Sequence, residues 1–208
     1  MITEESVMRA IVDSAMARSN LKGVASIIPG LISPFIRRLL NNLAHDADGY
    51  LEVGTLAGAG VISAAYGNTG NFYAVDDFSY HAGEPLSAVS DLAGGYPWGR
   101  EMQIPEAWQH HVDKVGVDPT LICMDWKAIE PAYWPQVEVL YYDAGHSFED
   151  TFLALEELPI YTGAKLILID DYNHGPVQDT VKAWTRPRVA EWTFPTEWNG
   201  FYLGLIDT

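Results

Sequence analysis

The stretch from Tyr50 to Asp77 constrains the fold of this chain more than any other part of the sequence. In order it contains a short apolar strand, a glycine-rich turn, a helix of small residues, a Gly-Asn turn and a second strand that ends in acid. This order is typical of the nucleotide-binding βαβ unit, in which a ligand lies at the carboxyl ends of parallel strands. The stretch therefore predicts an α/β fold with a ligand site after its first strand.

The glycine-rich turn suggests what kind of ligand binds there. Gly54, Gly58 and Gly60 allow positive φ and the close approach of a ligand to bare backbone. A helix that begins near Gly58 offers free N–H groups and a positive dipole end. Glu52 lies two residues before Gly54, and a carboxylate there would repel a pyrophosphate but can hold an ammonium group. Asp76, at the end of the second strand, is placed to accept hydrogen bonds from both hydroxyls of a ribose.

This combination resembles motif I of the class I S-adenosylmethionine (SAM) methyltransferases. In that family the glycine loop faces the methionine part of SAM, and the acid after the second strand holds the ribose. The resemblance implies SAM as the cofactor. The binding residues that it implies are Glu52, Gly54, Thr55, Gly58, Gly60, Asp76 and Asp77.

Two other functions remain open for this segment, and a third interpretation assigns it no ligand. An NAD(P)-dependent oxidoreductase is disfavoured, because dinucleotide folds use a G-x-G-x-x-G spacing that this turn lacks. A SAM-fold binding or scaffold protein without catalysis would share most of the same residues. A glycine-rich turn without any ligand is the remaining alternative.

A third strand over residues 120–124 ends in Asp125 and Trp126. The acid at this point resembles the methyltransferase position that reaches the adenine amino group, and the following residue packs on the ring in that family. The resemblance adds both residues to the implied cofactor site. The alternative is that Asp125 caps the segment that follows.

Two further strands, over residues 137–142 and 165–169, each end in acid. The first is followed by Asp143-Ala144-Gly145-His146 and the second by Asp170-Asp171. Three carboxylates at one sheet edge repel one another unless they are protonated or paired with a cation. Mg²⁺ or Ca²⁺ is the natural partner, since no thiol or histidine cluster suggests zinc. His146 is close enough to Asp143 in sequence to act as a base there.

This second group resembles the metal-dependent small-molecule O-methyltransferases of the catechol and caffeoyl-CoA types. It resembles still more the macrocin-type sugar O-methyltransferases, which share an Asp-x-x-His turn. The resemblance implies that Asp143, Asp170 and Asp171 bind a divalent cation such as Mg²⁺, and that His146 deprotonates the acceptor hydroxyl. The plant-type pattern has Asp-Asn after this strand instead of Asp-Asp. In the alternative interpretation, Asp143 binds the SAM ammonium without a metal, and Asp170 or Asp171 caps the next segment.

The order of elements predicts one domain over residues 1–208, with a Rossmann-like, doubly wound and mostly parallel seven-stranded sheet. Amphipathic helices over 3–17 and 34–44 form an N-terminal extension over residues 1–46, and the first of them turns Val7, Met8 and Val12 to one side. Strands over 189–194 and 201–206 flank Asn199-Gly200 and predict a C-terminal antiparallel hairpin. The long insertion over 78–104, with Tyr80, Tyr96 and Trp98, is interpreted as a lid.

Composition limits the partners. The chain has 208 residues and a net charge of −16, which argues against nucleic acid and anionic membranes as partners. No long apolar run or signal peptide is apparent, and the single Cys123 suits a reducing compartment, so a cytoplasmic location is expected. We expect a small-molecule acceptor, which the sequence does not identify, and the apolar N-terminal helices could form a homodimer surface.

Overall fold

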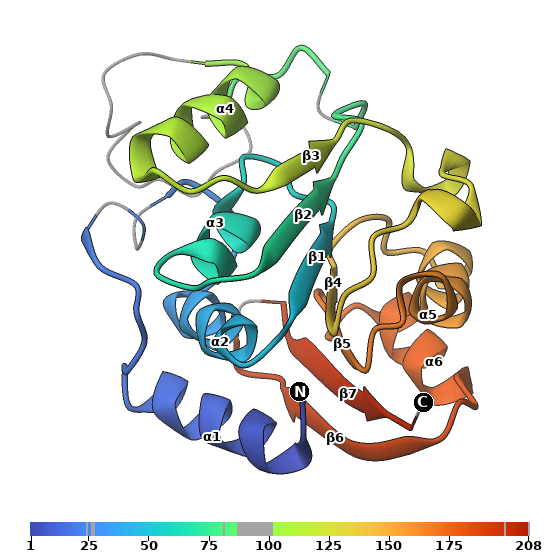
Figure 1. Cartoon of the computed structure of the whole chain (residues 1–208). Helices are drawn as coiled ribbons and strands as arrows, with labels where there is room; N and C mark the ends of the chain where they lie inside the picture. Colours follow the sequence, from blue (N-terminus) through green and yellow to red (C-terminus); the bar gives the residue numbers. More distant parts are fainter. Residues whose placement is uncertain (24, 26–27, 81, 87–101, 198, 208) are drawn as a thin grey trace.

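The computed structural model describes residues 1–23, 25, 28–80, 82–86, 102–197 and 199–207 (Figure 1). A seven-stranded sheet with the order β3-β2-β1-β4-β5-β7-β6 runs through the centre of the molecule. Strands β1 to β5 pair in parallel, and β7 runs antiparallel between β5 and β6. The strands are β1 (Gly49–Val53), β2 (Asn71–Val75), β3 (Thr120–Ile122), β4 (Val139–Tyr142), β5 (Leu166–Ile169), β6 (Arg188–Phe194) and β7 (Phe201–Ile206). The predicted sheet and C-terminal hairpin are confirmed.

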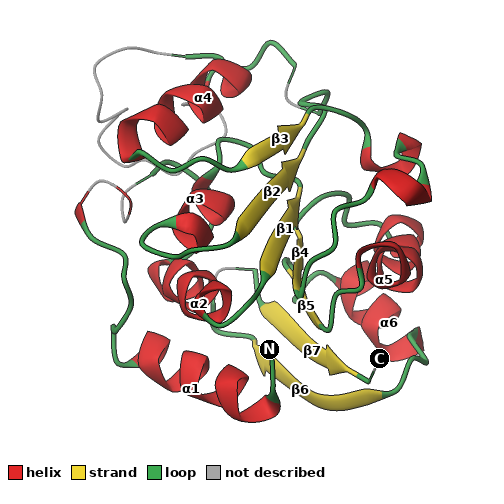
Figure 2. Ribbon diagram, viewed as in Figure 1, coloured by secondary structure: helices red, strands yellow, loops and turns green. Residues whose placement is uncertain are grey.

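Helices cover both faces of this sheet (Figure 2). Helices α1, α2 and α3 lie on one side and α5 and α6 on the other, while α4 packs beside α3 next to β3. The helices are α1 (Glu4–Ala15), α2 (Pro34–His45), α3 (Ala59–Ala65), α4 (Ile104–Val115), α5 (Phe148–Thr162) and α6 (Gly175–Ala183), with short 3₁₀ turns at Trp126–Ala128 and Pro131–Tyr133. This is the doubly wound arrangement that the order of elements predicts.

The central strands are apolar because both of their faces are buried. In β5, Leu166 and Leu168 pack into the cluster under α1–α3, whereas Ile167 and Ile169 pack into the cluster under α5 and α6. All four side chains are at most 1% exposed. A strand between two layers of helices needs such a continuous apolar run, and this run fixes β5 in the interior of the sheet.

Capping signals set the starts of the N-terminal helices. Thr3 and Ser6 form a capping box at α1, and the Ser33 hydroxyl accepts the Ile36 N–H at the start of α2, which has proline at its first position. The predicted inward side of α1 is partly wrong. Val7 is fully buried, but Met8 and Val12 are 42% and 49% exposed.

The physical reason is the position of α1 at the rim of the fold. The buried positions of α1 are Ser6, Val7, Ala10 and Ser14, a narrow stripe of mostly small residues. A helix that packs closely on one neighbour, here α2, buries only such a stripe and leaves larger apolar residues at its flanks.

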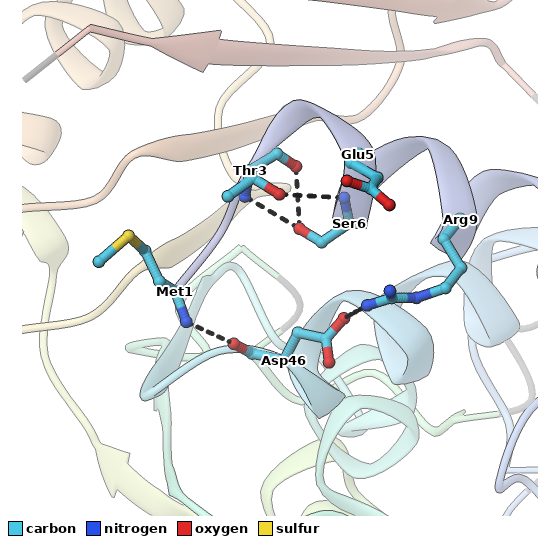
Figure 3. A pocket seen from close by; sticks show the side chains of 6 residues that line it. All are labelled: Met1, Thr3, Glu5, Ser6, Arg9 and Asp46. Carbon is cyan, nitrogen blue, oxygen red and sulfur yellow. Dashed lines mark hydrogen bonds and ion pairs between the residues drawn. The ribbon is translucent and has the colours of Figure 1, made fainter.

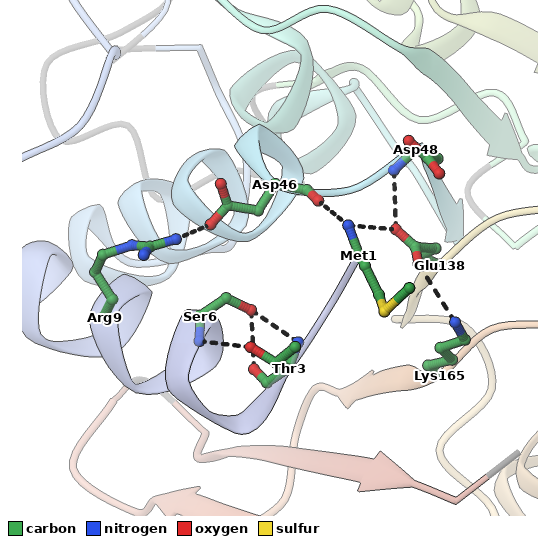
Figure 4. A network of polar contacts seen from close by, with 8 residues as sticks. All are labelled: Met1, Thr3, Ser6, Arg9, Asp46, Asp48, Glu138 and Lys165. Carbon is green, nitrogen blue, oxygen red and sulfur yellow. Dashed lines mark hydrogen bonds and ion pairs between the residues drawn. The ribbon is translucent and has the colours of Figure 1, made fainter.

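Polar contacts tie the N-terminus to the amino-terminal end of the sheet (Figure 4). The Met1 ammonium donates to the Asp46 carbonyl at 3.1 Å and lies 3.6 Å from Glu138, which also accepts from the Asp48 N–H. A shallow hollow of about 260 Å³ lies beside this network and is lined by Met1, Thr3, Glu5, Ser6, Arg9 and Asp46 (Figure 3). Arg9 and Asp46 pair across it, so these two charged groups already have a partner within the protein.

Several predicted boundaries shift by a few residues. Helix α5 continues through Pro159, which costs one hydrogen bond, and ends where Gly163 adopts φ 70°. Strand β3 stops at Ile122 because the chain then turns toward the 3₁₀ helix at Trp126. Within the described parts of the chain, no helix is both long and apolar enough to span a membrane.

Candidate active site

A pocket of about 760 Å³ lies across the carboxyl ends of the parallel strands. Its lining comes from the turns after β1, β2, β4 and β5, from the segment after β3, from residues 30–32 before α2, and from the turn between β6 and β7. All the predicted site residues except Gly58 line it: Glu52, Gly54, Thr55, Gly60, Asp76, Asp77, Asp125, Trp126, Asp143, His146, Asp170 and Asp171. The parallel sheet therefore brings both predicted groups of residues into one cavity.

The glycines of the turn make room for protein atoms as well as for a ligand. Gly54 has φ 91°, and a Cβ built on it would lie 2.1 Å from the Asp143 carbonyl oxygen. A Cβ on Gly60 would lie 2.4 Å from Glu52 Oε2. Gly58 has φ 88°, precedes α3 and packs on Trp108. The missing side chains of these glycines therefore leave room for Asp143, Glu52 and Trp108, while Gly54 and Gly60 also line the pocket.

Glu52 lies at the bottom of the pocket under α3. It is only 2% exposed, and its carboxyl group accepts a hydrogen bond from the Tyr50 hydroxyl at 3.2 Å. Burial raises the pKa of Glu52 well above its ordinary value, and the nearby charge of Asp143 raises it further. A cation that entered the pocket would lower this pKa, since it would stabilise the ionised carboxylate. Glu52 is thus suited to a cationic ligand group.

The turns after β1 and β2 form one end of the pocket, which we call the cofactor end after the ligand part predicted for it. Asp76 organises these two turns. Its Oδ2 accepts the Leu56 N–H at 2.9 Å, and its Oδ1 accepts the Phe78 N–H at 2.8 Å. Leu56 and Phe78 have φ of 48° and 55°, which is unfavourable for bulky side chains. Burial raises the pKa of Asp76, although these two backbone hydrogen bonds oppose the shift. Each oxygen keeps a second lone pair for a ligand hydroxyl.

The neighbouring polar residues have local partners too. Asp77 is exposed, and its Oδ1 accepts from the N–H and hydroxyl of Ser79, which lowers its pKa. Asp125 Oδ1 accepts the Lys127 N–H at 3.0 Å and so caps the 3₁₀ turn, as the alternative interpretation has it. Trp126 meets Tyr142 edge-on at 5.7 Å. Asp125 and Trp126 nevertheless both line the pocket, so capping and cofactor contact are compatible.

The turns after β4 and β5 form the other end of the pocket, which we call the acceptor end. It holds a side-chain cluster that the sequence analysis did not predict. The Tyr141 hydroxyl lies 3.0 Å from Asp143 Oδ2 and 3.0 Å from Asp170 Oδ2. Burial raises the pKa of Asp170 well above its ordinary value and raises that of Asp143, and each residue's proximity to other carboxylates adds to the effect. One hydroxyl proton cannot serve two acceptors fully, so a proton held by one of these carboxyl groups completes the arrangement.

His146 lies between the carboxylates of Asp143 and Asp171. Its Nδ1 is 3.2 Å from Asp171 Oδ2, and its Nε2 is 3.7 Å from Asp143 Oδ1. Nε2 is buried and has no hydrogen-bond partner. Burial lowers the pKa of His146, but Asp143 and the charge of Asp171 outweigh it, so the pKa is raised overall. Asp171 has φ 53°, which makes it the third residue of positive φ, after Leu56 and Phe78, to line the pocket without being a glycine.

The arrangement does not support the predicted magnesium site. Across the described residues, no group of three or more His, Cys, Asp or Glu side chains is arranged to hold a metal ion. Asp143 and Asp170 both face the Tyr141 hydroxyl, and Asp171 faces His146. The three acids do meet at one edge, as predicted, but protein groups hold their oxygens.

The pocket does fit SAM. The Thr55 hydroxyl is buried, lines the pocket and has no hydrogen-bond partner. An unsatisfied buried hydroxyl is costly unless a ligand or water completes it. It lies close to Glu52, which is suited to a cation, and the Asp76 carboxylate lies at the end of the next strand. These groups suit the ammonium and ribose of one nucleoside.

Two residues buried behind the pocket lining, Tyr141 and His111, were missed or assigned to packing. Tyr141 precedes Asp143 by two residues on one strand, and the two-residue period of strands could have indicated that both point the same way. His111 is buried on α4, and its Nδ1 lies 2.7 Å from the Ala57 carbonyl, so it supports the glycine-rich turn. His174 and Asn199 also line the pocket, and the sequence pattern indicates only a loop and a turn there. Of the proposed lid, Tyr96 and Trp98 lie outside the described residues, whereas Tyr80 lines the pocket and is 90% exposed.

A parallel sheet with an antiparallel strand beside β5, and a pocket across its carboxyl edge, is the fold of the class I SAM-dependent methyltransferases. No protein-family model matches the chain, and no curated protein matches it in sequence. Solved structures match it in fold, and the three described next are each similar over 100% of this chain.

The O-methyltransferase of Bacillus cereus in complex with SAH is 13% identical, with a TM-score of 0.60 and 93% of that chain covered. The SAH-bound methyltransferase of Podospora anserina is 10% identical, with a TM-score of 0.58 and 89% covered. The O-methyltransferase TomG of Streptomyces achromogenes, in complex with SAM, is 15% identical, with a TM-score of 0.55 and 92% covered. At these identities the likeness establishes the fold.

Proposed function

We propose that this protein is a SAM-dependent methyltransferase that transfers a methyl group to a hydroxyl oxygen of a small molecule. One observation carries the proposal. His146 Nε2 is buried, has no hydrogen-bond partner and lies 3.7 Å from Asp143 Oδ1, in the same pocket as the groups that suit SAM. A binding or scaffold protein would have no need of an oriented base at that point.

Four groups would hold the cofactor. Glu52 and Thr55 would receive the ammonium, and Asp76 would accept from the ribose hydroxyls with the lone pairs that Leu56 and Phe78 leave free. Trp126 would contact the adenine beyond β3. Bound SAM supplies an electrophilic methyl group on a sulfonium, which is a good leaving group, so the protein's part is positioning and exclusion of water.

His146 would remove the acceptor's proton. With the Nδ1 proton directed to Asp171, the lone pair of Nε2 is free to accept from a hydroxyl. Bound SAM would supply its methyl carbon to the acceptor oxygen with loss of the thioether, and Nε2 would keep the proton. Asp171 would orient the ring and stabilise its charged form, and Asp143 would stabilise it from the Nε2 side at 3.7 Å.

A label-transfer screen tests the proposal. The protein is incubated with methyl-labelled SAM and a panel of phenols, sugars and other hydroxyl compounds, and the products are identified by mass spectrometry. We expect transfer to an oxygen with wild type, and a loss of about 100-fold or more with His146→Gln. His110→Gln, on the helix outside the pocket lining, is the control that should retain activity.

Two results would contradict the proposal. Label that reaches a nitrogen or carbon acceptor would refute the oxygen specificity. If no compound of the panel takes label although SAM binds, a SAM-binding protein without catalysis would be the better description. Thermal-shift titration with SAM, SAH and NAD distinguishes both outcomes from an oxidoreductase.

A further inference from the structure

Tyr141 is placed between the carboxyl groups by the register of the sheet. Tyr141 and Asp143 are two residues apart, so their side chains leave β4 on the same side. Strand β5 pairs with β4 in the register Tyr142 to Ile169, which sets Asp170 beside Asp143. The Asp170 N–H donates to the Tyr142 carbonyl at 3.1 Å and holds this alignment beyond the strand ends. The Tyr141 hydroxyl therefore lies between the carboxyl groups of Asp143 and Asp170.

The core packing fixes this hydroxyl. The Tyr141 side chain is fully buried, and its ring lies 5.6 Å from the ring of Phe201 on β7, at an angle of 50°. A buried ring in such contact has one rotamer available, so its hydroxyl cannot swing away when a ligand enters. The contacts of 3.0 Å to Asp143 and Asp170 are thus built into the fold and do not depend on a loop.

These contacts differ from those of an oxygen-ligand cage. Mg²⁺ and Ca²⁺ need several carboxylate or carbonyl oxygens that converge on one point at roughly 2.0–2.6 Å. Here the two Oδ2 atoms converge on a hydroxyl group, and the third acid, Asp171, is turned to His146. A cation would have to displace the hydroxyl from both carboxyl groups and break the Asp171–His146 contact.

We propose that Tyr141 takes the place of a divalent cation in this site, so that the chain binds no catalytic metal. The hydroxyl keeps Asp143 and Asp170 together, as a metal ion would, and Tyr141 is a positioning residue. Asp171 is then left free to orient His146. The part of this inference that concerns catalysis rests on the proposed methyl transfer, whereas the part that concerns metal binding does not.

Manganese binding tests it without any acceptor. Chelator-treated protein is titrated with Mn²⁺, and free ion is followed by electron paramagnetic resonance, for wild type, Tyr141→Phe and Tyr202→Phe. Tyr202 is a matched control, because it is 1% exposed and its hydroxyl contacts one carboxylate, Glu191, away from the pocket. Tyr141→Phe keeps the ring on Phe201, and a thermal melt of each variant verifies folding.

We expect no saturable Mn²⁺ site in wild type or Tyr202→Phe, and a saturable site in Tyr141→Phe. Saturable binding in wild type that Asp143→Asn abolishes would overturn the inference. An unchanged Mn²⁺ affinity in a folded Tyr141→Phe would overturn the role of Tyr141. If that variant does not fold, the wild-type titration with Asp143→Asn still decides whether a metal binds.

A chelator experiment extends the test to catalysis. The wild-type protein is assayed with methyl-labelled SAM and the same hydroxyl panel, with and without excess EDTA. Equal rates support the inference, and a rate that EDTA abolishes and Mg²⁺ restores overturns it. If neither sample transfers label, the proposed function fails, and the Mn²⁺ titration alone decides the metal question.

Discussion

The two ends of the pocket hold their carboxylates in different ways. At the cofactor end, Asp76 and Asp125 accept hydrogen bonds from backbone N–H groups of their own or neighbouring turns. At the acceptor end, Asp143, Asp170 and Asp171 contact the side chains of Tyr141 and His146. Backbone donors never titrate, so they favour fixed acceptors for a ligand, whereas hydroxyl and imidazole partners can exchange protons. This difference supports the proposal that one end binds the cofactor and the other transfers a proton.

Gly54 is the point where the two ends meet, and altering it should have the largest effect. In Gly54→Ala, the new Cβ would clash with the Asp143 carbonyl at 2.1 Å in a backbone conformation of φ 91°. We expect a loss of about 3 kcal/mol or more in unfolding free energy, together with loss of SAM binding. Denaturant unfolding measures the loss of unfolding free energy, and calorimetry measures SAM binding.

Gly116→Ala is the matched control for this change. Gly116 also has positive φ, 75°, but a Cβ there meets nothing within 4 Å. Its cost should be only about 1 kcal/mol, from backbone strain. Equal losses in both variants would mean that the contact between the two turns is unimportant.

His146→Gln should separate the two ends cleanly. The change removes the base but leaves Glu52 and Asp76 untouched, so kcat should fall about 100-fold or more while the Kd for SAM stays within about twofold. Steady-state kinetics measures kcat, and calorimetry measures the Kd for SAM. A Kd that rises as much as kcat falls would show that the two ends do not act independently.

Asp76→Asn should give the opposite pattern. The amide can still accept one backbone N–H, but it loses the charge-assisted bonds to the ribose and presents an NH₂ group to one partner. We expect the Kd for SAM to rise about tenfold, with kcat at saturating SAM nearly unchanged. An unaltered Kd would remove Asp76 from the cofactor site.

The pH dependence of kcat tests the acceptor end alone. The raised pKa of His146 means that its neutral, proton-accepting form predominates only above the ordinary value of 6.5. Activity should therefore be lost as pH falls, with a midpoint above 6.5. Asp171→Asn removes a negative charge and should move the midpoint to lower pH. A profile that Asp171→Asn leaves in place would exclude His146 as the titrating base.

The smallest effect is expected at Lys127, which follows Trp126, the residue proposed to contact the adenine. Its Nζ contacts Asp150 Oδ1 at 2.9 Å, but the side chain is 44% exposed. Exposed ion pairs are worth little, so Lys127→Met should change stability by no more than about 0.5 kcal/mol and leave the Kd for SAM nearly unchanged. A larger rise in Kd would show that Lys127 contacts the cofactor directly.

The contrast between the two ends also explains what the sequence could predict. The cofactor end is mostly contained in the stretch from Tyr50 to Asp77, where strand, turn and helix signals are local. The acceptor end depends on partners far apart in the chain, such as Tyr141 and Asp170, 29 residues apart. Clustering of acids at the sheet edge followed from the parallel topology. Which group lies between them depended on register and packing, which the pattern does not encode.

The same reasoning accounts for the errors in the fold. The apolar run of β5 predicted its strand because burial on both faces demands it, whereas β7 was predicted from its place beside the Asn199-Gly200 turn. The inward side of α1 was misassigned because periodicity finds an apolar side but not how much of it a neighbour covers, and Met8 and Val12 remain exposed. Gly54 and Gly60 also serve contacts within the protein, with Asp143 and Glu52, which the glycine pattern alone does not indicate.

Calorimetric titration of the wild-type protein with SAM, SAH and NAD tests the central claim most directly. The arrangement of Glu52, Thr55 and Asp76 predicts saturable binding of SAM and SAH at one site and no binding of NAD. Heat with NAD alone, from protein that melts cooperatively, would contradict the assignment of this pocket to a sulfonium nucleoside.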